Sequence, residues 1–227
     1  MSAIAFYRLA GKKIKELVQP YGFKKNGRFF YRITEEGIVQ QFCLLWLHHS
    51  FTVRFYLSSI YSDNGKDIEG AEIYEIINGS VNQWLSESCS DFVITTNNFV
   101  LDAANLCTQA VQNTLLPFFE LHRDPVSARN FITGHSPRIT QGLDKYDIRE
   151  LGLFLSLGDV SSVRDFLEYH IEHCDRYNKH WWNGVEQEYR HILAAIDAND
   201  KEYLSLYMDD KRNKTYSEYK WKNEKQL

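Results

Sequence analysis

The sequence predicts an α+β protein: a small antiparallel β-meander of three or four strands packed by helices, followed by an all-helical C-terminal extension of αα-hairpins. Three observations predict this class. An amphipathic segment opens the chain, apolar segments separated by tight turns run through Phe23–Tyr61, and the chain beyond Leu143 has helical periodicity. With 44% hydrophobic residues, 12 glycines and 4 prolines, the composition of the 227 residues is that of an ordinary globular chain.

The first helix is expected at about residues 2–18. Apolar residues from Ala3 to Leu17 recur at spacings of three and four, which places them on one helical face. Pro20 and Gly22 then end the helix.

Three strands are expected next, at residues 29–33, 38–47 and 51–58. The first and third alternate between two faces, whereas the second is almost entirely apolar, as in a central strand covered on both sides. The short turns between them favour antiparallel neighbours. Residues 92–95 fit a fourth short strand.

A helix is expected at about residues 68–84 and a stronger one at 99–116. Residues 123–142 are rich in proline and glycine, so they are predicted to form a connecting loop. This loop would join an α+β sheet domain of residues 1–122 to a helical extension of residues 143–227 packed on it.

Two αα-hairpins are expected in the extension. Gly158-Asp159 and Asn199-Asp200 each separate two helical segments. A Gly or Asn that ends one helix and an Asp that caps the next are typical of such a hairpin.

One face of the predicted sheet is a candidate binding surface. The core face is expected to bury Phe29 and Tyr31 with the strand residues Phe42, Leu44, Trp46, Phe51, Val53 and Phe55. The opposite face would then present Phe30, Arg32, Gln41, Thr52, Arg54 and Tyr56. Interleaved aromatic and arginine residues are favoured at protein interfaces and on single-strand nucleic-acid platforms. The alternative is that helices cover this face and its polar groups pair internally.

Charge is unevenly distributed along the chain. Residues 1–32 hold eight basic side chains against Glu16 alone, which gives +7, although the whole chain carries −4. A basic end is typical of a surface that binds nucleic acid or an acidic partner. Alternatively, these lysines only solvate the outer side of the first helix and a hairpin rim.

Motifs for catalysis or cofactor binding are absent from the sequence. Neither GxxxxGK[ST] nor GxGxxG occurs, and Gly134-His135-Ser136-Pro137 lacks the GxSxG pattern of a nucleophile elbow. We therefore predict no catalytic residues and no cofactor. A cluster of possible metal ligands comprises Glu168, His170, His173, Cys174 and His180, but without an HExxH motif its histidines also fit imidazoles buried beside tryptophans. We favour the buried imidazoles and predict no metal site.

The chain is expected to be cytoplasmic. Its first residues have no uninterrupted apolar run before the lysines, which argues against a signal peptide. No apolar stretch approaches the length of a membrane span. The four scattered cysteines suit a reducing compartment.

The N-terminal half resembles a bacterial domain-of-unknown-function family, the one numbered 4304. The resemblance covers roughly residues 3–122 and rests on four segments, which are IKELVQPYGFKKNGRFFYRI, VQQFCLLWL, FTVRFYL and a later helix ending LLPFFEL. It implies a helix-flanked antiparallel sheet and carries over no active-site residues.

Together these features favour a non-enzymatic binding module. We expect an immunity-type or regulatory partner of another bacterial protein, with binding residues Phe30, Arg32, Gln41, Arg54 and Tyr56. The alternative is a nucleic-acid-binding protein that uses the basic N-terminal region. The sequence fixes neither the partner's identity nor the oligomeric state.

Overall fold

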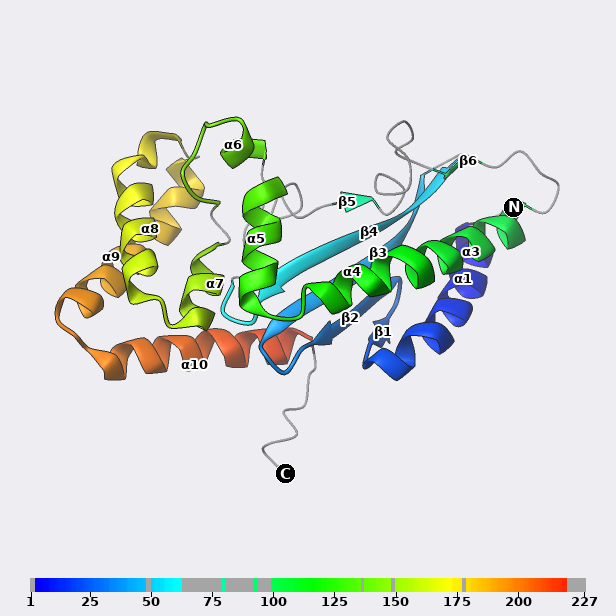
Figure 1. The fold of residues 1–227 in the computed structure, drawn as a ribbon, viewed down its shortest axis with the longest axis horizontal. Coiled ribbons are helices and arrows are strands. Elements are labelled where there is room, and N and C mark those ends of the chain that lie inside the picture. Colours follow the sequence, from blue (N-terminus) through cyan, green and yellow to red (C-terminus); the bar gives the residue numbers. More distant parts are fainter. Residues whose placement is uncertain are drawn as a thin grey trace, which may run out of the picture. The chain divides into compact units, whose positions relative to one another are not determined.

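The computed structural model describes residues 3–47, 50–62, 79–80, 92–93, 99–135, 137–147, 150–176 and 179–219. The chain divides into two compact units. Unit 1 comprises Met1–Leu57 and Ile77–Ser127, and unit 2 comprises Ser58–Ile76 and Ala128–Leu227. The predicted α+β class is confirmed, because an antiparallel sheet is followed by helices (Figure 1).

The sheet contains the three predicted strands and three further short ones. Its strands are β1 (Lys24–Asn26), β2 (Phe29–Ile33), β3 (Ile38–Leu47), β4 (Ser50–Ser59), β5 (Gly79–Ser80) and β6 (Phe92–Val93). They follow the order β1-β2-β3-β4-β5, and β6, the predicted fourth strand, pairs with β4.

Two parts of the sheet differ from the prediction. β1 was missed because its sequence, Lys-Lys-Asn, carries no apolar side chain to signal a strand. Of the helix predicted at 68–84, only Gly79 and Ser80 belong to the described residues, and they form β5. The rest of that segment, like His48 and His49, lies outside the described residues.

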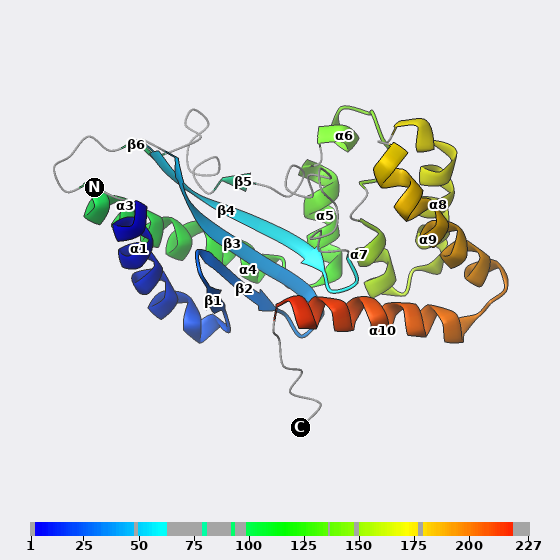
Figure 2. The same ribbon diagram turned by 180° about the vertical axis from the view of Figure 1, so that it is seen from behind.

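Helices cover one face of the sheet in unit 1. Here α1 (Ala3–Val18) packs against α3 (Phe99–Ala110), which continues through the π-helical turn η2 (Val111–Leu115) into α4 (Leu116–Leu121). Figures 1 and 2 show α3 and α4 lying over the strands and following their direction. Pro117 explains the π-helical turn, because a proline nitrogen cannot donate the regular helical hydrogen bond and its ring needs extra room.

Stacked aromatic rings form the core of unit 1. The rings of Phe30 and Phe42 stack with their centroids 4.7 Å apart, and Phe23 and Phe119 pack around Phe42. The predicted burial of Phe42, Leu44, Val53 and Phe55 is confirmed. The side chains of Trp46 and Phe51 lie outside the described residues.

Unit 2 is helical in its described part. It contains most of α5 (Pro125–His135), then α6 (Pro137–Thr140), α7 (Glu150–Leu157), α8 (Val160–Glu172), η3 (Cys174–Arg176), α9 (Lys179–Asp197) and α10 (Lys201–Glu218). The connecting loop predicted at 123–142 is therefore wrong, because α5 and α6 occupy most of it. Pro125 begins α5 instead of breaking a helix, and the Asp124 carboxylate accepts hydrogen bonds from the N–H groups of Val126 and Ser127.

Both predicted αα-hairpins are confirmed. Gly158 and Asn199 adopt the left-handed conformation, with φ of 64° and 53°, where one helix ends. Asp159 and Asp200 then cap α8 and α10 by accepting backbone hydrogen bonds at 3.0 and 2.9 Å.

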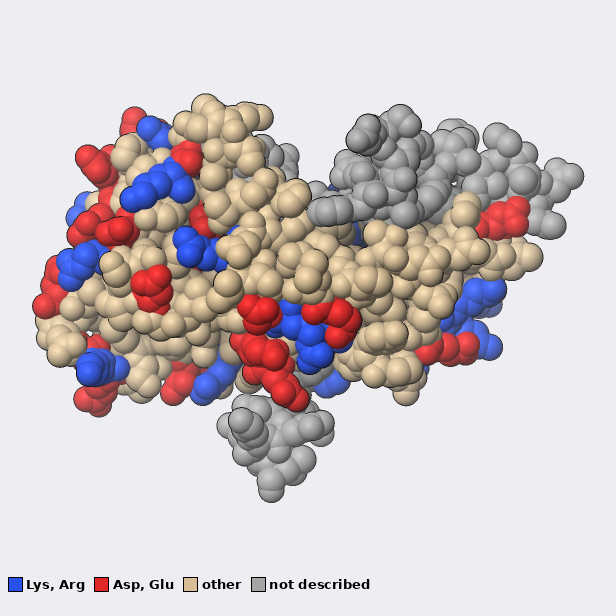
Figure 3. All heavy atoms as spheres, viewed as in Figure 1, with Lys and Arg blue, Asp and Glu red and all other residues tan. Residues whose placement is uncertain are grey.

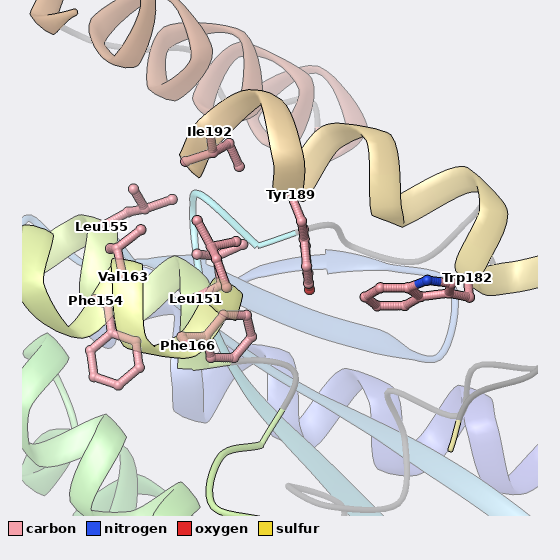
Figure 4. Close-up of a cluster of buried hydrophobic side chains, with 9 residues drawn as sticks. Leu151, Phe154, Leu155, Val163, Phe166, Trp182, Tyr189 and Ile192 are labelled. Atoms are coloured by element: carbon pink, nitrogen blue, oxygen red, sulfur yellow. The ribbon is translucent and has the colours of Figure 1, made fainter. Parts of the chain in front are cut away.

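The core of unit 2 lies between α7, α8 and α9 (Figure 4). Its buried members are Leu151, Phe154, Leu155, Val163, Phe166, Leu167, Trp182, Tyr189 and Ile192. The end of β4 also belongs to this unit. The Ser59 and Ser156 hydroxyl oxygens are 2.7 Å apart, and the Thr215 hydroxyl donates to the Ile60 carbonyl at 2.9 Å.

Candidate functional site

Two of the five predicted binding residues lie on the helix-covered face. In the β2–β3 register, Phe30 is opposite Phe42 and Arg32 is opposite Gln40. Directly opposed residues of antiparallel strands share a face, so both side chains point into the core. Phe30 is fully buried and Arg32 is 6% exposed. Their assignment to an open face was wrong because three successive aromatic residues in β2 conceal which positions point inward.

Arg32 holds the sheet to neighbouring backbone and to α4. Its Nε donates to Gln40 Oε1 at 2.7 Å, Nη1 donates to the Tyr21 carbonyl at 2.8 Å, and Nη2 donates to Glu120 Oε1 at 2.6 Å. The guanidinium also lies 4.7 Å from the Phe23 ring centroid. Paired in this way, the buried cation serves the fold and is closed to a partner.

Two further side chains donate hydrogen bonds to carbonyl groups at and just after the C-terminal end of α4. Gln40 Nε2 donates to the carbonyls of Phe119 and His122 at 2.6 and 2.9 Å. The Thr34 hydroxyl donates to the Arg123 carbonyl at 2.8 Å. The last carbonyls of a helix lack intrahelical partners, so these bonds fix where α4 lies on the sheet.

The other three predicted residues do share the opposite face. Tyr31 is opposite Gln41 in the β2–β3 register, and the Tyr56 hydroxyl lies 3.7 Å from the Cys43 sulfur. Arg54 and Tyr56 alternate along β4 with the buried Val53, Phe55 and Leu57. We call the set Phe29, Tyr31, Gln41, Arg54 and Tyr56 the outer face. Figure 2 shows the strands with α3 and α4 behind them.

The outer face is aromatic and positively charged. Lys24 is opposite Tyr31 in the β1–β2 register, and the Arg28 guanidinium lies 5.3 Å from the Phe29 ring centroid. Lys24 and Arg28 are exposed, Arg54 and Tyr56 are half-buried, and Tyr31 is buried. The sequences of β1 to β4 contain no Asp or Glu. This face therefore offers cations and aromatic rings with no carboxylate from the strands themselves.

Cys43 lies beneath this surface as a thiol. Burial raises its pKa, and this effect outweighs the Tyr56 hydrogen bond and the nearby Arg28 and Arg54 charges, which lower it. Burial also raises the pKa of Tyr31. Both shifts lead away from neutral pH, so neither group gains the ionised form that a nucleophile or general base needs.

The histidines of the possible metal site pack on aromatic rings. His170 is buried with its ring 4.2 Å from that of Phe166, and His173 stacks on Tyr169 at 4.4 Å. The side chain of His180 lies outside the described residues. Within the described ranges, no three His, Cys, Asp or Glu side chains come close enough together to hold a metal ion.

Comparison of the chain with protein-family models, with curated proteins and with solved structures finds no match. The resemblance to the family numbered 4304 therefore stays a prediction. Of the helices that the structure describes, none combines the length and apolar character of a membrane span.

Proposed function

We propose that this protein is a non-enzymatic binding protein whose outer face recognises an acidic surface of a partner protein. The observation that carries the proposal is the composition of that face. Half-buried Phe29, Gln41, Arg54 and Tyr56 share this face with the buried Tyr31, exposed Lys24 and Arg28 border it, and the strands contribute no carboxylate.

Tyrosine and arginine are the residues that protein interfaces enrich. Tyr56 is already fixed by its contact with Cys43, and Arg28 lies on the Phe29 ring. Side chains held in place before binding lose less conformational entropy when the partner docks. The surrounding cations would speed encounter with an acidic patch and disfavour basic partners.

An immunity-type or regulatory role in a bacterial cytoplasm is the class of function that this proposal favours. Such a protein acts by occupying a surface of its target, so it needs a recognition face and no reactive group. Cys43 and Cys107 are buried free thiols, which supports a reducing compartment.

The test is a cross-linking capture from the native cell with three tagged forms of the full chain. The outer-face variant carries Arg28→Glu and Arg54→Glu, and the control carries Arg190→Glu and Lys201→Glu on exposed positions of α9 and α10. We expect the wild type and the control to recover the same partner and the outer-face variant to lose it. With purified partner, the outer-face variant should bind at least about tenfold more weakly, which corresponds to about 1.4 kcal/mol.

Two results would contradict this function. One is a partner that the outer-face variant retains with wild-type affinity. The other is no partner recovered by the wild type after cross-linking. Circular dichroism of each variant checks that the sheet remains folded.

A further inference from the structure

A second basic surface lies on the outward side of α1. Arg8, Lys12 and Lys15 are spaced four and three residues apart, so they share one side of the helix. All three are exposed, whereas Phe6 and Ile14 on the other side of the helix are fully buried.

Lys25 of β1 adds a fourth cation to this surface. A Cβ atom built on Gly11 would lie 3.0 Å from Lys25 Cε, so the lysine stem lies across α1 at a position where a side chain is missing. Its ammonium group donates to the Gly27 carbonyl at 2.6 Å and remains on the exposed surface. We call Arg8, Lys12, Lys15 and Lys25 the basic ridge. Figure 3 shows Lys and Arg side chains gathered over α1.

The ridge keeps its positive charge. Among the residues that the structure describes, no carboxylate forms an ion pair with Arg8, Lys12 or Lys15. The neighbouring Lys13, which lies outside the ridge, donates to Asn105 at 2.8 Å. Glu16 is the one acidic residue in the sequence of α1.

The chemistry of the ridge differs from that of the outer face. Three of its four members are lysines, which protein interfaces disfavour, and no aromatic ring belongs to it. Phosphate contacts need solvated cations and no apolar anchor. From Arg8 to Lys15 the ridge extends for roughly 10 Å, about three steps along a duplex axis.

From these observations we infer that the basic ridge binds the phosphate backbone of a nucleic acid without reading its base sequence. Ridge and outer face are different surfaces with different ligands, so this inference stands whether or not the proposed protein partner exists. Backbone binding of this kind is strongly salt-dependent, because each neutralised phosphate releases counterions.

The test measures fluorescence anisotropy of labelled single-stranded RNA, single-stranded DNA and duplex DNA of random sequence with the full chain. The ridge variant carries Arg8→Gln, Lys12→Gln and Lys15→Gln. The matched control carries Lys145→Gln, Arg190→Gln and Lys201→Gln, which removes the same charge from exposed positions of unit 2.

We expect the wild type and the control to bind at low salt within about twofold of each other. The ridge variant should bind at least about tenfold more weakly, and its log–log salt slope should fall by about two units, because each phosphate contact contributes about 0.7–0.9. Oligonucleotides of different sequence should bind within a few-fold of one another.

Several results would overturn the inference. These are no binding by the wild type at low salt, equal binding by the ridge variant, equal weakening in the control, or a strong preference for one base sequence. Polyglutamate that displaces the nucleic acid as well as unlabelled nucleic acid does would assign the ridge to an acidic protein instead. If the triple variant does not fold, Lys12→Gln and Lys15→Gln as single variants should each lower the salt slope by about 0.7–0.9.

Discussion

Two sets of polar contacts, one in each unit, join residues at very different distances along the chain. In unit 1, Arg32 bonds Glu120 and Gln40 bonds the Phe119 carbonyl across 88 and 79 residues. In unit 2, Asp159 and Asp200 cap their helices through N–H groups three residues ahead. A hydrogen bond between neighbouring residues can be predicted from the sequence, whereas a bond to a group about eighty residues away cannot.

The two units also differ in charge. Over their full ranges, unit 1 has ten basic and eight acidic residues, a net charge of +2, and unit 2 has 16 basic and 22 acidic, a net charge of −6. Most cations of unit 1 come from α1, β1 and the β1–β2 turn. Both surfaces named above, the outer face and the basic ridge, belong to unit 1.

The largest loss of stability should follow truncation of a buried aromatic ring, and it should be similar in the two units. Phe42→Ala in unit 1 and Phe166→Ala in unit 2 should each lower the free energy of unfolding by about 3–5 kcal/mol, because both rings are fully buried among other rings. Urea unfolding measures this. A loss below about 1 kcal/mol in either would contradict the core assigned to that unit.

Arg32→Met compares a buried arginine that bonds distant residues with an exposed arginine that pairs within its own helix. It removes three hydrogen bonds and leaves the buried oxygen of Gln40 unpaired, so we expect a loss of about 2–3 kcal/mol. The lower end of the buried-pair range applies because the Glu120 side chain is 38% exposed and can be hydrated. Arg190→Met, which removes an exposed ion pair of α9, should cost less than about 0.5 kcal/mol. Equal losses from both, measured by urea unfolding, would show that Arg32 has no special structural role.

Gly152 tests the close approach of α7 to the chain that follows β4, and Gly184 in α9 serves as the comparison. A Cβ on Gly152 would lie 2.5 Å from Ser62 Oγ and 2.9 Å from the Ser62 nitrogen, so Gly152→Ala should cost about 1–3 kcal/mol. Gly184 in α9 meets nothing within 4 Å, and Gly184→Ala should stabilise the helix by about 0.5–1 kcal/mol. Opposite shifts of the thermal midpoint are expected. A shift of the same sign in both would contradict this packing.

Removing a helix cap should have a smaller effect. Asp159→Ala and Asp200→Ala should each cost about 1 kcal/mol, and replacement by Asn should cost much less, because Asn keeps an oxygen that accepts the N–H bond. Thermal unfolding of the four variants measures this. If Ala and Asn proved equivalent, the local caps of α8 and α10 would not contribute to the stability of unit 2.

The smallest effect concerns pH. Burial raises the pKa of Glu150, despite its bonds to the Asp147 N–H and the Thr133 hydroxyl and the nearby Arg129. The folded state therefore holds the proton more tightly than the unfolded state, so this residue's contribution to stability falls as pH rises above about 4.3, the ordinary glutamate value. Glu150→Gln should remove that decline. Urea unfolding of both proteins from acidic to neutral pH should show their difference changing in favour of the variant as pH rises. A change in the opposite direction would contradict the raised pKa.

The candidate surfaces were only partly predictable. Gln41, Arg54 and Tyr56 were placed on one face correctly, because β4 alternates clearly and its register is easy to read. On β2 the outer face carries Phe29 and Tyr31, whereas the prediction had placed Phe30 and Arg32 there. The run Phe-Phe-Tyr does not show which positions point inward. The basic residues of α1 were visible in the sequence, but the contribution of Lys25 was not, because it depends on the contact between β1 and Gly11.

By itself, the sequence determined the features governed by neighbouring residues: the α+β class, the amphipathic first helix, the three long strands and the two capped hairpins. Tertiary structure alone decided which face of β2 is buried and why an arginine is stable inside the sheet. Shifting a strand's alternation by one residue exchanges its two faces, and the side chains of β2 favour neither choice strongly. The partners that settle it, Glu120 and the end of α4, lie far along the chain and meet Arg32 only in the folded unit.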